Sequence, residues 1–280
     1  MTPTDGLAAD TALEQIGEHL HQAVLPPDWA VWGPHGGFLA ALALCAAGAH
    51  APDARPLSIG CDFLAPAEFD KVELETVPFH TARTSRALRV TMTQRGRPVM
   101  AASVWTAGTH LTSPERAWRP APDLPPPEEL PGFDRLMREA GQEPPPIFKH
   151  TDQRPVAWPD DYFTRSGGDA AITTWARFLP QGTFPGDPWL DAARSVILTD
   201  LGLFPAVAAG LAASEMVFTA PNVNLHVAFH QRRPDHEWLL FEGEGLAICD
   251  GTLAARSIIS TADGAVVATG VGQMLYRPFA

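Results

Sequence analysis

The chain has 280 residues, of which 45% are hydrophobic and 19% are charged. This composition allows a sizeable core in one large or two ordinary domains, and it excludes global disorder. The formal net charge of -12 argues against a nucleic-acid partner held through its phosphates, although a local site can still bind an anionic small ligand.

Cysteine content and N-terminal composition both indicate a cytoplasmic protein. The three cysteines, Cys45, Cys61 and Cys249, are a sparse and odd set, typical of a reducing compartment without a disulfide framework. Residues 1–15 lack a basic region followed by an apolar one, so we expect no signal peptide. The longest apolar run, 38–47, is too short to span a bilayer, and we expect no membrane association.

The first predicted elements are a strand and an enclosed helix. Residues 11–26 fit both helical and strand periodicity, and Pro26-Pro27 favours a strand near 19–25. The stretch WGPHGGFLAALALCAAGAH then places two glycines before a run that is apolar on every side. Such a run is typical of a helix surrounded by the rest of the protein.

The glycines at 36 and 37 have two interpretations. Gly36 and Gly37 can leave backbone N–H groups exposed at a helix N-terminus, which suits an anion or a carbonyl oxygen. A tight turn explains the same residues equally well. His35 adjoins them and is either a substrate contact or a turn residue.

Several strands follow this helix. Residues 56–64 and 71–81 read as strands, and the second alternates apolar and acidic residues as a half-buried strand does. Residues 88–93 and 99–106 read as a hairpin with its turn at Arg95-Gly96. Residues 111–160 then hold many of the chain's 28 prolines, which predicts an extended connector with a short helix at 133–140.

The second half opens with a strand at 172–179 and a helix beginning at Asp187. Asp187 can cap the helix and Pro188 suits its first position. At about 100° per residue, Asp200 falls in the middle of the apolar arc. A buried carboxylate there needs a partner. It either caps a neighbouring loop or carries chemistry.

The remaining strands repeat the order of the first half. Residues 222–230 correspond to 58–64, residues 238–248 to 71–81, and the terminal hairpin to the first one. Gly264 lies 168 positions after Gly96 (264 − 96), and Phe229 lies 166 positions after Phe63 (229 − 63). Such similar offsets predict a duplicated unit of strand, helix and antiparallel strands.

This pattern resembles the acyl-CoA thioesterase II family. The residues that carry the resemblance are WGPHGGFLAALAL, CDFLAP, QRGRPVMAASVW, ILTDLG, NVNLHVAFH and DGAVVATGVGQMLYRP. The resemblance implies an α+β double hotdog, with two antiparallel sheets each wrapped around a central apolar helix. It divides the chain into an N-terminal hotdog at 1–110, the connector at 111–160 and a C-terminal hotdog at 161–280.

The resemblance also implies a catalytic set. In that family a helix Asp, a Thr or Ser at a strand start and a Gln in the last strand hold a water against the thioester. The Asp matches Asp200. The hydroxyl position falls on or near Asn222, and the Gln falls on Gly272 or, one place further, on Gln273. We therefore assign Asp200, Asn222 and Gln273 as catalytic and His35, Gly36 and Gly37 as substrate-binding.

The function expected is hydrolysis of an acyl-CoA thioester by Asp-assisted water attack, at the Asp200 site of the two pseudo-equivalent sites. A non-catalytic acyl-CoA binding protein and another hotdog enzyme, such as a dehydratase, remain open alternatives. We expect no cofactor and no metal, because His226 and His230 have no evident third ligand. The expected partners are the acyl-CoA substrate and further copies of the chain, as a homodimer or higher homo-oligomer.

Overall fold

The computed structural model describes residues 6–116, 118–159 and 162–279. Its first half contains α1 (Leu7–Asp10), β1 (Glu14–Gln15), β2 (Leu20–Val24), α2 (Gly36–His50), β3 (Ala54–Phe63), β4 (Lys71–Thr81), β5 (Ser85–Gln94) and β6 (Arg97–Gly108). Its second half contains α3 (Phe133–Glu139), β7 (Thr151–Pro155), β8 (Ala171–Phe178), α4 (Pro188–Ala209), β9 (Phe218–Thr219), β10 (Asn222–Phe229), β11 (Leu239–Cys249), β12 (Thr252–Ser260), β13 (Val266–Leu275) and β14 (Arg277–Pro278).

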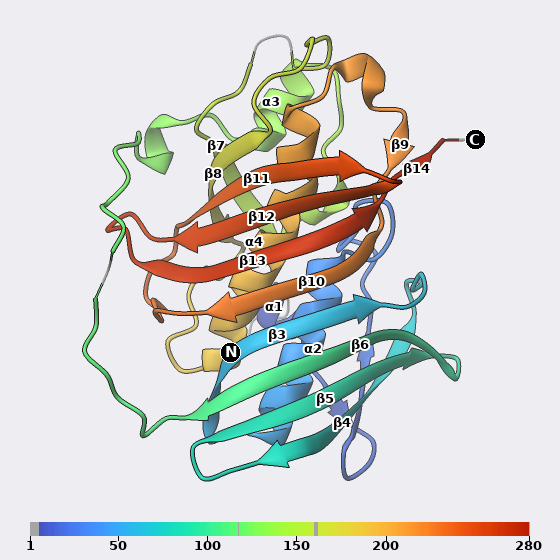
Figure 1. The fold of residues 1–280 in the computed structure, drawn as a ribbon, viewed down its shortest axis with the longest axis vertical. Helices are drawn as coiled ribbons and strands as arrows, with labels where there is room; N and C mark the ends of the chain where they lie inside the picture. Colours follow the sequence, from blue (N-terminus) through green and yellow to red (C-terminus); the bar gives the residue numbers. More distant parts are fainter. Residues whose placement is uncertain (1–5, 117, 160–161, 280) are drawn as a thin grey trace.

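The two sheets expected from the sequence are one continuous antiparallel sheet. Within the described residues its order is β1-β2-β4-β5-β6-β3-β10-β13-β12-β11-β8-β7, which reads as two similar halves that meet at β3 and β10. There Cys61 lies opposite Leu225 in an antiparallel ladder. Because an edge strand exposes unpaired amides and carbonyls, joining the two edges removes both of them from solvent. Figure 1 shows this sheet crossing in front of α2 and α4.

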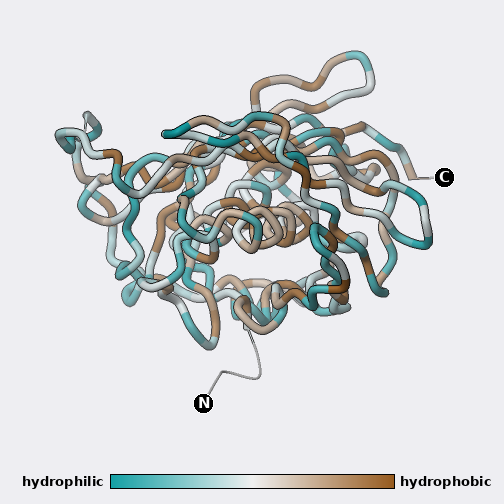
Figure 2. The backbone as a smooth tube through the Cα atoms, turned by 90° about the horizontal axis from the view of Figure 1, so that it is seen from below, coloured by the Kyte–Doolittle hydropathy of each residue, from teal (hydrophilic) through white to brown (hydrophobic). Residues whose placement is uncertain are grey.

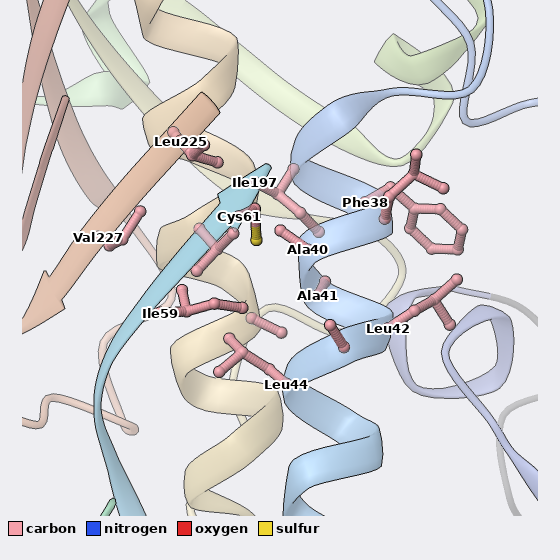
Figure 3. Packing of buried hydrophobic residues seen from close by; sticks show 14 of the residues in the cluster. Phe38, Ala40, Ala41, Leu42, Leu44, Ile59, Cys61, Ile197, Leu225 and Val227 are labelled. Carbon is pink, nitrogen blue, oxygen red and sulfur yellow. The ribbon is translucent and has the colours of Figure 1, made fainter. Parts of the chain in front are cut away.

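Helix α2 is enclosed because its residues are apolar all round. From Gly37 to Gly48 nearly every side chain is buried, and small alanines allow the sheet and α4 to approach. Ala40 and Ala41 face α4, while Ile59 and Cys61 of β3 cover another side (Figure 3). Seen from below, the helix coils lie beneath the arch of the sheet (Figure 2). Glycine is unfavourable inside a helix, and the burial of apolar surface along the whole of α2 offsets this cost.

Helix α4 begins where the sequence predicts. Asp187 Oδ1 accepts hydrogen bonds from the amides of Trp189 and Leu190, and Pro188 occupies the first helical position. The helix continues through Pro205 to Ala209, where the buried residues 206–208 hold it against the sheet. By length and composition α4 could cross a membrane, but most of it is buried inside the protein.

The proline-rich connector is more structured than expected. It contains α3, close to the short helix predicted at 133–140, and also β7, which pairs with β8 and extends the sheet. The amide of Ile147 donates to the carbonyl of Ala30, so the connector packs on the loop that precedes α2. This contact brings connector side chains close to the N-terminus of α2.

Candidate active site

The carboxylate of Asp200 lies at the contact between the two central helices. Its Oδ2 accepts a hydrogen bond of 2.6 Å from the amide of Gly37, 163 residues earlier in the chain, and lies 3.0 Å from Nε2 of His35. Its Oδ1 accepts a hydrogen bond of 2.6 Å from Nδ2 of Asn222. Both Asp200 and His35 are buried. Three donors, two from the start of α2 and one from β10, therefore hold one buried carboxylate in a fixed orientation.

Both glycines of the HGG stretch are required by close contacts. A Cβ on Gly36 would lie 2.4 Å from Nδ2 of Asn222 and 3.1 Å from Oδ2 of Asp200. A Cβ on Gly37 would lie 2.9 Å from atoms of Asp200, His35 and Ile197. The absence of side chains at both positions lets α2 begin directly against the carboxylate.

His35 occupies the N-cap position of α2 and approaches Asp200 through Nε2. Burial lowers the pKa of His35, and the neighbouring Asp200 carboxylate opposes that shift. The ring is therefore neutral near pH 7, and the acceptor at Oδ2 requires the proton to sit on Nε2. Nδ1 of His35 is buried and accepts no hydrogen bond from any described residue. A neutral donor thus faces the carboxylate.

Asn222 begins β10 beside a β-bulge between Asn222 and Asn224. Because its Nδ2 donates to Asp200, its amide oxygen is left as an acceptor. An amide can orient a water molecule but cannot take a proton from it at neutral pH. Asn222 therefore takes the position that the resemblance assigns to Thr or Ser. It offers an amide oxygen as the acceptor in place of a hydroxyl oxygen.

Gln273 does not belong to this site. Its Oε1 accepts a 3.0 Å hydrogen bond from Nδ2 of Asn224 on the exposed face of the sheet. The neighbouring Gly272 faces inward instead, and a Cβ there would lie 2.6 Å from Leu203 of α4. Gln273 therefore lies on the face of the sheet opposite Asp200, because successive residues of a strand point to opposite faces.

A large cavity opens from this cluster. Its volume is about 1530 Å³, and His35, Gly36, Asp200 and Asn222 form part of its lining. The other walls are mainly apolar and aromatic. They come from the 31–34 loop, the end of β3, α4, β8 and β11, and from connector side chains including Phe133, Phe148 and Trp158.

The connector aromatics were not identified from the sequence as part of a site. Phe133 stacks on Phe148 at 4.4 Å between ring centroids and meets Trp158 edge-on at 5.4 Å, and Trp158 stacks on Tyr162 at 4.1 Å. The sequence feature that could have identified them is the high density of aromatic residues in an otherwise proline-rich segment. Such residues need an apolar surface to cover, and the cavity provides it.

The pseudo-equivalent position in the other half is closed. Counted from the first helical residue, Gly48 of α2 corresponds to Asp200 of α4, and Trp189 of α4 corresponds to Gly37 of α2. The ring of Trp189 lies against Gly48, where a Cβ would approach it to 2.6 Å. The carboxylate is thus missing there, and an indole fills its space.

The continuous antiparallel sheet with enclosed helices and a carboxylate-centred cavity defines a hotdog-fold protein. Two family models match the chain: the acyl-CoA thioesterase N-terminal domain over residues 25–107 and the acyl-CoA thioesterase C-terminal domain over residues 121–276. The chain therefore belongs to the acyl-CoA thioesterase family and is an acyl-CoA thioester hydrolase. A search of curated proteins gave no match.

Solved structures agree in fold. The chain is similar to a tesB protein of Mycobacterium avium subspecies paratuberculosis, with 25% identity, a TM-score of 0.74 and coverage of 97% of this chain and 98% of that one. A hotdog-fold protein of unknown function from Alicyclobacillus acidocaldarius has 24% identity, a TM-score of 0.79 and 97% coverage of each chain. The acyl-CoA thioesterase II TesB2 of Mycobacterium marinum has 21% identity, a TM-score of 0.75 and coverage of 96% and 97%.

Proposed function

We propose that this protein hydrolyses its acyl-CoA thioester with Asp200 as the general base. One observation carries the proposal: a buried carboxylate that lines the cavity is fixed by Gly37, His35 and Asn222. A carboxylate has about four acceptor sites on its two oxygens. Two donors reach Oδ2 and one reaches Oδ1. The acceptor position that remains open is therefore on Oδ1, next to Asn222.

A water molecule at this site would have both of its protons held. One would bond to Oδ1 of Asp200 and the other to the amide oxygen of Asn222, which is free because Nδ2 faces the carboxylate. The oxygen lone pair would then point away from both acceptors, toward a thioester in the cavity. Orientation and partial deprotonation of the water are what attack on a thioester needs.

Gly36 supplies the donor for the oxyanion. Its amide lies at the N-terminus of the 15-residue helix α2, lines the cavity and donates to no described residue. Negative charge that develops on the carbonyl oxygen is favoured there by the free N–H and by the helix dipole. The neighbouring Gly37 amide is already bonded to Asp200, so Gly37 positions the base and does not contact substrate.

Water, Asp200 and the Gly36 amide account for every proton and electron pair that the hydrolysis moves. Water attacks the carbonyl carbon while Asp200 accepts one proton, and the carbonyl electrons move to the oxyanion at Gly36. Collapse of this intermediate re-forms the carbonyl and breaks the carbon–sulfur bond. The electron pair leaves with the sulfur of CoA, and the proton held by Asp200 can pass to the thiolate. The products are a free acid and CoA.

The test is release of free thiol from a panel of acyl-CoAs that differ in chain length. Asp200→Asn keeps size and hydrogen bonding but removes the base, and we expect turnover to fall by roughly a hundredfold or more. Asp62→Asn, on the exposed side of β3, is the matched control and should keep wild-type activity. Wild-type thiol release by Asp200→Asn would refute the assignment. Water addition to an enoyl-CoA without thiol release would indicate that Asp200 and His35 act on a carbon–carbon double bond.

A further inference from the structure

Two buried polar residues line the cavity away from Asp200. Among the described residues, four polar side chains are both buried and part of the lining: His35, Asp200, Gln153 and Thr174. The first two belong to the catalytic cluster. Gln153 and Thr174 are only 7% and 6% exposed and take no part in the proposed reaction. Their presence in an otherwise apolar wall needs a separate explanation.

These two residues lie on the same inward face of the sheet. Gln153 is on β7 and Thr174 on β8, and the register places Thr174 opposite Pro155, two residues after Gln153. Residues related in this diagonal way are neighbours on one face, about 7–8 Å apart at Cα. A single small group on a ligand can therefore reach both side chains.

Within the described part of the chain, no hydrogen bond engages the side-chain oxygen of either residue. Nε2 of Gln153 donates to Oγ1 of Thr151 at 3.1 Å, which fixes the amide and leaves Oε1 as an acceptor. Neither Oε1 of Gln153 nor the hydroxyl of Thr174 forms a side-chain hydrogen bond with another described residue. Neither atom is among the fully buried side-chain atoms without a hydrogen-bond partner, so both are accessible from the cavity. An alkyl group that excluded water from these two atoms would leave them unpaired, which is unfavourable, so apolar residues would suit a purely alkyl substrate better here.

The chemistry of the pair favours a neutral hydroxyl group. Gln153 offers an acceptor, and Thr174 offers both a donor and an acceptor. A hydroxyl group can donate to the first and accept from the second. A carboxylate is a poorer match, because Arg165, a cation of the cavity lining, already donates to the carbonyls of Tyr162 and Ala208.

The ring of Phe241, which also lines the cavity, lies beside Thr174 and contacts α4, the helix that carries Asp200. Thr174 lies opposite Phe241 in the β8–β11 ladder. The Phe241 ring in turn lies 3.2 Å from where a Cβ on Gly202 would be, two residues after Asp200. The cavity, at about 1530 Å³, also exceeds the roughly 300–1,000 Å³ of ordinary small-molecule sites. An extended acyl group can therefore reach from Asp200 past Phe241 to the polar pair.

We propose that the acyl group bound in this cavity is largely apolar and carries a hydroxyl group remote from the thioester, which Gln153 and Thr174 bind. This inference deepens the proposed function and rests on it, because it assumes that the thioester lies at Asp200. The apolar body contacts the aromatic walls, and the hydroxyl selects among acyl groups of similar size.

The test compares dodecanoyl-CoA and hexadecanoyl-CoA with analogues in which one hydroxyl is moved along the chain, from the third carbon to the last. For at least one remote position, wild-type kcat/KM should exceed that of the plain chain by about tenfold, the scale of one or two hydrogen bonds. Thr174→Val and Gln153→Leu should each reduce this ratio to near one. Thr91→Val, outside the cavity lining, should keep the wild-type ratio.

A second measurement separates this inference from the proposed reaction. Titration calorimetry of Asp200→Asn with the same acyl-CoAs reports binding without turnover, and it should show the same preference for the remote hydroxyl. Preference in binding with no thiol release by the wild type would overturn the reaction and support the polar pair. Equal rates and equal affinities at every hydroxyl position would overturn the inference and show that Gln153 and Thr174 bind only water.

Discussion

The indole ring of Trp189 lies against Gly48 at the position where Asp200 lies against Gly37 in the other half. A Cβ on Gly48 would approach Cγ of Trp189 to 2.6 Å, in a region where the ring is buried. The duplicated unit has therefore kept two helix contacts of similar geometry and used them differently. One holds a carboxylate at a cavity, and the other is filled by a side chain that contributes to the core.

This packing makes Gly48→Ala destabilising. A buried indole cannot move aside easily, so overpacking should lower the free energy of unfolding by about 1–3 kcal/mol. Trp189→Leu in the same chain should recover part of the loss by making room. Urea unfolding of both single variants and the double variant gives the comparison. Additive losses would show that the Gly48–Trp189 contact is not the cause.

Gln273 and Asn222 should respond differently to truncation. Gln273→Ala removes a side chain on the exposed face and should leave kcat/KM within about twofold of wild type, as surface changes do. Asn222→Ala removes a donor to Asp200 and the proposed water acceptor, so thiol release should fall by tenfold or more. A larger loss for Gln273→Ala than for Asn222→Ala would mean that the last strand presents its other face to the site.

Gly36→Ala tests whether the close approach of α2 to the carboxylate matters. The added Cβ would lie 2.4 Å from Nδ2 of Asn222, so the amide must move and the Asn222–Asp200 hydrogen bond should break. Overpacking and loss of this hydrogen bond should lower the free energy of unfolding by about 1–3 kcal/mol, and kcat should fall about a hundredfold because the residue that positions the water is displaced. Unchanged kcat would show that the close approach of α2 to the carboxylate is not needed for the reaction.

Stability should decrease in mild acid partly because of His35. Burial lowers the pKa of His35 below the ordinary histidine value of about 6.5. The unfolded chain then binds the proton more readily than the folded chain, so this contribution is present above about pH 6.5 and is lost as pH falls below it. His35→Gln should therefore show a smaller drop in urea midpoint between pH 7.5 and pH 5.5 than wild type. His80→Gln, at an exposed position of β4, is the control, and an equal drop in both variants would contradict the assignment.

Local pattern predicted much of this fold. The alternation of acidic and apolar residues from Lys71 to Thr81 predicts β4 with the bounds observed, and Arg95-Gly96 forms the predicted turn, with positive φ at both residues. The capping residues Asp187 and Pro188 predict the start of α4. These features depend on residues close together in the chain, where periodicity and turn chemistry act directly. The duplication likewise followed from offsets in the sequence.

The tertiary structure alone decided which side chains meet. Gly37 and Asp200 are 163 residues apart, so no local pattern could pair the amide of one with the carboxylate of the other. A shift of one residue separates Gly272 from Gln273, and only the strand register fixes which of them faces the helix. Joining of β3 to β10 and closure of the connector over the cavity also depend on contacts between distant segments. The sequence determined the elements and the carboxylate, and packing between the two halves determined the site.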